Sequence, residues 1–171
     1  MPNKWTFTIK PIKELLNRYV GNGKGWIDPF AGMYSPAEFT NDLNPDVNAK
    51  YHLPAEKFLL SLNGQLYEGG LYDPPYSLRQ IMECYNGFGL TCDKKWATTK
   101  FYSDTKTLLA SKIKENGIAI SFGWNSIGLG KKRGFEIIEV LLVSHGRLHN
   151  DTIVTVERKK EKVASKQQNL F

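Results

Sequence analysis

Apolar residues recur through the first half of the chain in short clusters that predict alternating helices and strands. An amphipathic run follows Pro11, with Leu15, Leu16 and Tyr19 available for burial and the proline near the first turn, where helix starts favour it. Residues 26–32 and 39–45 read as short strands, and a third strand ends at residue 73. Strands alternating with helices in this way predict the α/β class.

The second half predicts further helices and the rest of the sheet. Pro54 interrupts the first helical pattern and is expected to kink or divide it, whereas Asn116-Gly117 is a favourable helix end. The segments expected here are, in order, a helix over 45–62, a helix over 78–85, a long loop over 86–103, a helix over 106–115, a buried strand over 118–122, a basic glycine loop over 128–134, and a hairpin of 135–143 with 152–158.

Acidic residues stand at the ends of the three strands predicted first: Asp28, Asp42 and Asp73. In open α/β sheets, ligands bind outside the carboxyl ends of the strands, near the point where the strand order reverses. We therefore expect these three carboxylates to line one crevice. For any one of them, the alternative is an acid that only caps a turn.

The segment Asp73-Pro74-Pro75-Tyr76 carries the most specific chemistry in the chain. Both prolines lack an N–H and have a fixed φ, so the strand must stop here in a rigid turn. Such a turn suits a flat heterocycle that bears an amino group, because the acid and a proline carbonyl accept hydrogen bonds while the ring stacks. The alternative is an acid and two prolines that merely cap a buried strand.

Taken together, these segments resemble the S-adenosylmethionine-dependent DNA methyltransferases that modify amino groups. The resemblance is greatest to the adenine-N6 enzymes, and to small phage-encoded forms among them. Its motifs span residues 8 to 77, and the strand–hairpin remainder extends it to about residue 158. The matching residues are Asp73, Pro74, Pro75 and Tyr76 for the catalytic motif, Asp28, Pro29, Phe30, Ala31 and Gly32 for the cofactor loop, Asp42 with Asn44 for the acid at the cofactor ribose, and Thr8, Lys10 and Pro11 for the segment at the methionine end.

The resemblance implies a Rossmann-like methyltransferase fold with a shortened, mostly parallel sheet that ends in an antiparallel hairpin strand. Residues 1–158 are expected to form this single domain, followed by a basic, disordered tail over 159–171. The implied cofactor is S-adenosylmethionine, the implied partner is DNA, and no metal is implied. The implied reaction methylates an exocyclic amino group, adenine N6 first, on a flipped-out or unpaired base.

In that reaction Tyr76 would stack on the base, while the Asp73 carboxylate and the Pro74 carbonyl accept hydrogen bonds from the amino group. Trp124 and Asn125 are candidates for the pocket wall, with core packing as the alternative for Trp124. Other functions that stay open are methylation of cytosine N4 or of RNA adenine, and a non-catalytic relative that only binds cofactor or DNA.

The chain also departs from the family pattern. Gly32 is followed by Met33-Tyr34, where the family usually has a second glycine, and residues 33–38 are too few for a crossover helix. The family's third strand and its helix have almost no sequence to occupy, so we expect a sheet that lacks this edge strand. No inserted target-recognition domain is visible. Recognition then falls to the 86–103 loop, to a recognition subunit, or to a homodimer.

The charge favours a polyanionic partner, since the 171-residue chain has a net charge of +6 and a pI near 9.2. Solvated loops are the alternative for each basic segment. The candidate nucleic-acid contacts are Lys94, Lys95, Trp96 and Lys100, and Lys131, Lys132 and Arg133.

The remaining features predict a cytoplasmic protein of a bacterium or of a phage-infected cell. No apolar run approaches the ~20 residues of a membrane span. Cys84 and Cys92 fit neither a zinc site nor a disulfide framework, so free thiols in a reducing compartment are expected. The histidines are scattered and read as surface residues, so no metal site is predicted.

Overall fold

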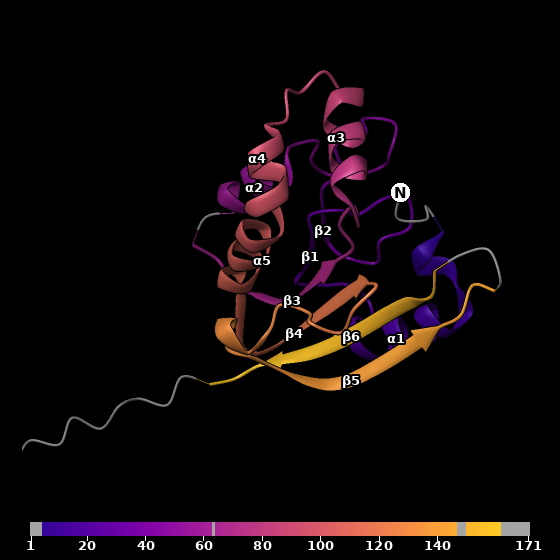
Figure 1. The fold of residues 1–171 in the computed structure, drawn as a ribbon. Coiled ribbons are helices and arrows are strands. Elements are labelled where there is room, and N and C mark those ends of the chain that lie inside the picture. The colour runs from indigo at the N-terminus through magenta and orange to yellow at the C-terminus, as the bar shows by residue number, and fades with distance from the viewer. Residues whose placement is uncertain (1–4, 63, 147–149, 162–171) are drawn as a thin grey trace, which may run out of the picture.

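A six-stranded sheet organises the computed structural model, which describes residues 5–62, 64–146 and 150–161 (Figure 1). Strands β2, β1, β3 and β4 pair in parallel, and β6 lies antiparallel between β4 and the edge strand β5. This arrangement confirms the predicted α/β fold with a shortened, mostly parallel sheet and a final antiparallel hairpin. In sheet order the strands are β2 (Phe39–Thr40), β1 (Trp26–Asp28), β3 (Tyr67–Tyr72), β4 (Ile113–Gly123), β6 (Thr152–Lys159) and β5 (Phe135–Val143).

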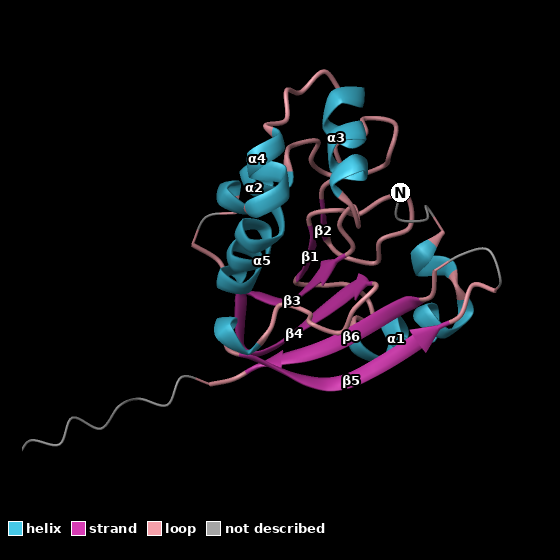
Figure 2. Ribbon diagram, viewed as in Figure 1, coloured by secondary structure: helices cyan, strands magenta, loops and turns pink. Residues whose placement is uncertain are grey.

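Helices cover both faces of the sheet, as Figure 2 shows. On one face α1 packs Ile12, Leu15 and Leu16 against apolar side chains of β3, β4 and β6. On the other face α2 and α5 cover β1, β3 and β4, while α3 and α4 form a smaller apolar cluster above the strand ends. The helices are α1 (Lys10–Tyr19), α2 (Ala55–Ser61), α3 (Leu78–Gly87), α4 (Lys94–Thr99) and α5 (Phe101–Lys112), with short 3-10 turns η1 (Thr6–Thr8) and η2 (Lys131–Arg133).

The register of the parallel strands brings the predicted acids to one edge. Ile27 pairs with Gly70, and Tyr72 pairs with Ser121, so Asp28 and Asp73 leave the sheet at the same end as β4. Because β3 is central, it is packed tightly on both faces. A Cβ on Gly69 would lie 2.7 Å from the Trp26 ring, and one on Gly70 would lie 2.8 Å from Leu109 Cδ1.

The family's third strand, which this chain was expected to lack, is represented by a single bridge. Tyr51 pairs with Asn41 beside β2, in parallel, and no named strand is formed there by the described residues. The predicted helix over 45–62 was wrong for its first part, since only Ala55–Ser61 is helical. The cause is local: Asp42 Oδ1 accepts from the Asn44 amide, and Asn44 Oδ1 accepts from the Asp46 amide, so side chains satisfy this backbone outside a helix.

Two further predictions were wrong in the middle of the chain. The expected loop over 86–103 contains α4 and the start of α5, and α4 begins where Asp93 Oδ1 accepts from the Trp96 amide as an N-cap. The expected helix over 106–115 instead ends at Lys112. Asn116, at φ 62°, lies within β4, where the register against β3 shifts. Asn116-Gly117 therefore marks a strand irregularity and not a helix end.

The other predicted elements are present. The helices expected after Pro11 and over 78–85 are α1 and α3, and the hairpin of 135–143 with 152–158 is β5 with β6. The predicted tail lies outside the described residues from 162 onward. Among the described helices, none has the length and hydrophobicity needed to cross a membrane.

Candidate active site

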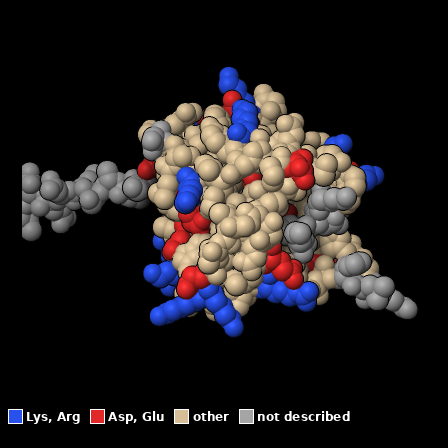
Figure 3. All heavy atoms as spheres, turned by 90° about the horizontal axis from the view of Figure 1, so that it is seen from above, with Lys and Arg blue, Asp and Glu red and all other residues tan. Residues whose placement is uncertain are grey.

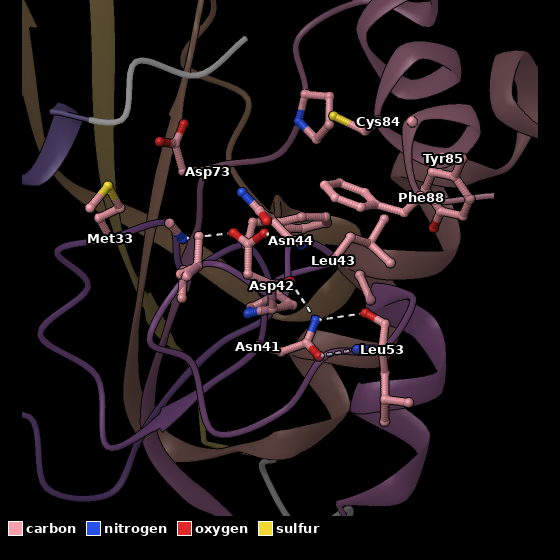
Figure 4. Close-up of a pocket in the computed structure, with 18 of the residues that line it drawn as sticks. Met33, Asn41, Asp42, Leu43, Asn44, Leu53, Asp73, Cys84, Tyr85 and Phe88 are labelled. Carbon is pink, nitrogen blue, oxygen red and sulfur yellow. Dashed lines mark hydrogen bonds between the residues drawn. The ribbon is translucent and has the colours of Figure 1, made fainter. Parts of the chain in front are cut away.

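A cavity of about 570 Å³ opens at the carboxyl end of the parallel strands. Its walls come from the η1 segment, the loop after β1, the segment after β2, Asp73 and Pro75 after β3, and the α3 helix. Figure 4 shows Met33, Asp42 and Asp73 toward one end and the apolar side chains of Leu43, Tyr85 and Phe88 toward the other. The cavity therefore has a polar end near the tetrapeptide and an apolar end beneath α3.

Asp42 fastens the loop after β1 to the segment after β2. Its Oδ2 accepts from the Gly32 amide at 2.9 Å, while Oδ1 accepts from the Asn44 amide. Gly32 has a φ of +54°, which a residue with a Cβ rarely adopts, so the loop needs glycine here. The carboxylate is partly exposed and keeps lone pairs for a ligand in the cavity.

Asp28 lies beneath the loop and not in the cavity wall. It is fully buried; Oδ1 accepts from the Phe30 amide and Oδ2 from the Ser35 hydroxyl, at 2.6 Å. Burial raises the pKa of Asp28 to about 6, against the lowering effect of these hydrogen bonds. Asp28 therefore shapes the loop through the backbone of Phe30, while Pro29, Phe30, Ala31 and Gly32 line the cavity.

Asp73 is the buried acid that lies in the cavity wall, with 4% of its surface exposed. The Tyr76 hydroxyl donates to its Oδ1, and the Thr6 hydroxyl also hydrogen-bonds the carboxyl group. Burial raises the pKa of Asp73 to about 7, and the nearby Asp28 raises it further, whereas the bonds from Tyr76 and Thr6 lower it. The carboxyl group thus changes charge near neutral pH.

Two polar contacts hold the tetrapeptide at the start of α3. Gln80 Oε1 accepts from the Tyr76 amide at 2.7 Å, while the Gln80 amide donates to the Ser77 hydroxyl at the N-cap. From the other side, the Tyr102 hydroxyl of α5 donates to the Pro75 carbonyl at 2.6 Å. The turn is therefore fixed to two helices, which keeps Asp73 and Tyr76 in place.

Asn41 anchors the edge of the site where the third strand is lacking. The side chain is buried; Nδ2 donates to the carbonyls of Pro29 and Leu53, and Oδ1 accepts from the Leu53 amide. Figure 4 shows these bonds between the two segments. One side chain thus joins the loop after β1 to the chain that leads into α2.

The cavity lining differs from the prediction at the N-terminal segment. Thr6 and Phe7 line the cavity, whereas Thr8, Lys10 and Pro11 do not. Thr8 is exposed, and its hydroxyl donates to the Trp5 carbonyl, so the 3-10 turn points it away. Asp42 and Asn44 do line the cavity.

The structure separates the two basic segments. Lys94, Lys95 and Lys100 are exposed on or beside α4, on the cavity side, while the Trp96 ring packs against Tyr85 and Phe101. Lys131, Lys132 and Arg133 form η2, next to Phe135. Phe135 pairs with Lys159 near the opposite end of the strands from Asp73. Arg133 is held there by Thr107 Oγ1 and the Leu129 carbonyl.

Several cavity residues were not singled out by sequence reasoning. Thr6, Phe7, Asn41, Tyr85 and Phe88 are brought to the site by tertiary packing. The Ser77-x-x-Gln80 spacing was a usable signal for the helix cap. Trp124 is 48% exposed and contacts Tyr76 edge-on at 5.5 Å, so the core-packing alternative was wrong.

Other predicted properties concern metals and thiols. Within the described ranges, no group of three or more His, Cys, Asp or Glu side chains is placed to hold a metal ion. Cys84 and Cys92 are free thiols, as expected.

Solved structures with the same overall fold are methyltransferases. The 1,6-didemethyltoxoflavin-N1-methyltransferase of Burkholderia thailandensis, solved with its substrate and S-adenosylhomocysteine, superposes with a TM-score of 0.57 at 13% identity, covering 89% of this chain and 78% of that chain. The N-methyltransferase NodS of Bradyrhizobium japonicum, solved with S-adenosylhomocysteine, gives a TM-score of 0.55 at 8% identity, covering 89% and 87%.

A protein of Escherichia coli named yhhF, described as a candidate methyltransferase, gives a TM-score of 0.57 at 11% identity, covering 90% of this chain and 88% of that chain. No protein-family model matches the sequence, and no curated protein matches it. At these identities the comparison establishes the fold alone. The chain has the Rossmann-like fold of S-adenosylmethionine-dependent methyltransferases.

Proposed function

We propose that the protein transfers a methyl group from S-adenosylmethionine to an exocyclic amino group of a DNA base, with adenine N6 as the first choice. The observation that carries the proposal is the position of Asp73 and Tyr76. The buried Asp73 carboxyl group lies at the end of a central parallel strand and lines the cavity. It accepts a hydrogen bond from the hydroxyl of Tyr76. The sequence Asp-Pro-Pro-Tyr at this place supports an amino-bearing heterocycle as the acceptor.

The cavity has the chemistry needed to hold the cofactor. Its volume lies within the range of small-molecule sites, about 300–1,000 Å³. The partly exposed Asp42 carboxylate suits the two ribose hydroxyls, and the apolar end with Leu43 and Phe88 suits an adenine ring. Thr6 and Phe7 border the opposite, polar end. When bound, the cofactor supplies an electrophilic methyl group.

The residues of the chain would then orient the amino group and remove a proton. The amino nitrogen gains a carbon and must lose one hydrogen as a proton. Asp73 is able to accept a hydrogen bond from the amino group and then its proton, because its pKa of about 7 makes it a better base than an exposed acid. Tyr76 would leave Asp73 and stack on the base, and the Pro74 carbonyl would accept the second N–H.

Nucleoside analysis by mass spectrometry of DNA incubated with protein and cofactor tests this function. Methylated adenine in the wild-type reaction, and its loss with Asp73→Ala, would support the proposal, provided that calorimetry shows the variant still binds S-adenosylhomocysteine. Undiminished methylation by Asp73→Ala would contradict it. N4-methylcytosine or methylated RNA would move the assignment to those substrates, and no cofactor binding at millimolar concentration would favour a non-catalytic relative.

A further inference from the structure

Two aromatic pairs, which include the exposed rings of Trp5, Tyr34 and Trp124, are linked to the surroundings of Asp73. In one pair Trp5 stacks on Tyr34, with 5.2 Å between the ring centroids and an interplanar angle of 21°. In the other pair Tyr76 contacts Trp124 edge-on. Trp5 is 46% exposed and Tyr34 is 40% exposed, although rings of this size are usually largely buried. Their exposure needs an explanation.

Neighbours in sequence and hydrogen bonds connect the two aromatic pairs. Trp5 precedes Thr6, whose hydroxyl bonds Asp73, and Tyr34 follows Met33, which lines the cavity. Asp73 in turn accepts the hydrogen bond from Tyr76. The Trp5–Tyr34 pair is therefore linked to Asp73 through the adjacent cavity-lining residues Thr6 and Met33, and Asp73 is linked to the other pair through Tyr76.

Local structure holds these rings in place. Trp5 is tied to η1 by its carbonyl, which accepts from the amide and the hydroxyl of Thr8. The turn after Trp124 is closed by Asn125 Oδ1, which accepts from the Ile127 amide. These bonds fix the backbone that carries Trp5 and Trp124, and the ring contacts with Tyr34 and Tyr76 restrict the side chains, so little conformational entropy is lost when a ligand stacks on them.

We propose that the Trp5–Tyr34 pair and the Tyr76–Trp124 pair form a stacking platform for an unpaired nucleic-acid strand, so that the substrate is single-stranded or locally melted. This inference rests on the proposed function and names the form of its substrate. In a duplex both faces of each base are covered by neighbours, so exposed rings find bases to stack on only where the strand is unpaired. Met33, 53% exposed, adds an adaptable apolar contact beside Tyr34.

The charge distribution supports the same choice of ligand. In Figure 3, which looks down on the side where α3 and α4 lie, the centre of the face is mostly uncharged and Lys and Arg side chains lie toward its margins. Readout of an intact duplex relies on Lys, Arg and polar side chains that reach phosphates and groove edges. Bases on the aromatic rings and phosphates near the Lys and Arg side chains, which lie among Asp and Glu side chains in Figure 3, match a single strand bound to a chain of net charge +6.

Fluorescence anisotropy tests the platform with a labelled adenine-containing oligonucleotide, as a single strand and as the matching duplex, in the presence of S-adenosylhomocysteine. We expect the single strand to bind more tightly than the duplex. Trp5→Ala and Tyr34→Ala should each weaken single-strand binding by about tenfold. Trp5→Phe and Tyr34→Phe should retain most of it, because a ring remains.

Leu66→Ala is the matched control, since Leu66 is a 58% exposed apolar residue that does not line the cavity, and it should leave binding unchanged. Calorimetry with S-adenosylhomocysteine verifies that each variant is folded. The platform would be overturned if the duplex is methylated and binds as tightly as the single strand or more tightly, and the two alanine variants have no effect. The proposed function would then still stand. The platform would also be overturned if free adenosine displaces the labelled oligonucleotide as effectively as unlabelled oligonucleotide does. If neither form of DNA is methylated by protein that binds S-adenosylhomocysteine, the proposed function itself fails.

Discussion

The hydroxyl of Tyr76 donates a hydrogen bond to Oδ1 of Asp73. The acid that is proposed to receive the substrate amino group is therefore held by the ring that is proposed to stack on the base. Without a ligand, this hydrogen bond gives the buried Asp73 carboxyl group a partner. A substrate amino group must replace the bond when it enters. Both residues are kept near one geometry, because Gln80 and Tyr102 fix the backbone around them.

The Tyr76 bond also controls when Asp73 is ionised. We expect methyl transfer to increase as the pH rises through about 7, where the pKa of Asp73 lies, because only the carboxylate can take up the proton that the amino group loses. Tyr76→Phe keeps the ring but removes a bond that lowers this pKa, so the increase should move to higher pH, by about half a unit to one unit. The pH dependence of kcat/KM measures the shift. A shift to lower pH would show that Asp73 is not the titrating group.

The same raised pKa has a consequence for stability. The folded protein holds the Asp73 proton up to about pH 7, whereas an unfolded chain releases it near the ordinary aspartate pKa of 3.8. The contribution of Asp73 to stability is therefore fully present at low pH and is lost as the pH rises through about 7. In Asp73→Asn the fall in stability between pH 5 and pH 8 should be smaller, by on the order of 2 kcal/mol.

Urea unfolding at the two pH values measures this difference. Asp151→Asn serves as the control, because Asp151 is an exposed acid in the turn between β5 and β6. An equal pH slope in wild type and Asp73→Asn would contradict the raised pKa.

Asn41→Ala should lower both the free energy of unfolding and the affinity of the proposed cofactor site. The change removes three hydrogen bonds and leaves the Pro29 carbonyl, the Leu53 carbonyl and the Leu53 amide without this partner. A loss of about 3 kcal/mol in the free energy of unfolding is expected. Calorimetry should show weaker binding of S-adenosylhomocysteine even where the variant is fully folded. Asn48→Ala, at an exposed position of the same segment, should change neither quantity.

Gly69→Ala should destabilise the centre of the sheet. A Cβ at this position would lie 2.7 Å from the Ile118 carbonyl oxygen and 2.7 Å from the Trp26 ring, and the β4 backbone has little room to move. We expect a loss of about 2–3 kcal/mol in urea unfolding. Gly87→Ala is the matched control, because no heavy atom lies within 4 Å of its Cβ position and its stability should remain within about 0.5 kcal/mol of wild type.

The two basic segments should differ in their effect on DNA binding. Lys94→Glu with Lys95→Glu places two negative charges on α4, on the cavity side, and should reduce affinity by about tenfold and flatten its salt dependence. Lys131→Glu with Lys132→Glu changes the distant η2 turn and should have a much smaller effect. Anisotropy titrations at two salt concentrations compare the variants. The reverse order would place the DNA on the other end of the molecule.

Sequence reasoning was accurate where a local pattern determines the element. The apolar segment over 135–143 and the turn that follows it predicted the hairpin, and the prolines after Tyr72 predicted the end of β3. The same reasoning placed Asp42 and Asp73 at one edge, because parallel strands end together. These predictions needed no knowledge of distant contacts.

Sequence reasoning was inaccurate where tertiary contacts decide the outcome. Asn116-Gly117 has the composition of a helix end, yet pairing with β3 draws the segment into β4. Residues 45–53 have helix-forming positions, but side-chain bonds from Asp42, Asn44 and Asn41 hold them in turns. Thr6 and Phe7 reach the cavity because η1 rotates Thr8 outward, an orientation that no local pattern indicates.

The sheet edge that is held by the Asn41 side chain and the single Tyr51 bridge should open locally more easily than the centre of the sheet. A full strand would form backbone hydrogen bonds along many residues, and local opening would have to break these bonds together. Here the Asn41 side chain and the two backbone bonds of Tyr51 hold the segment from 42 to 53, which has few other ladder bonds. Amides of this segment should exchange with solvent faster than those of β3 or β4, and bound cofactor should slow that exchange. Without a bound ligand, the sheet edge at Asn41 would then open locally while the turn at Asp73 stays closed.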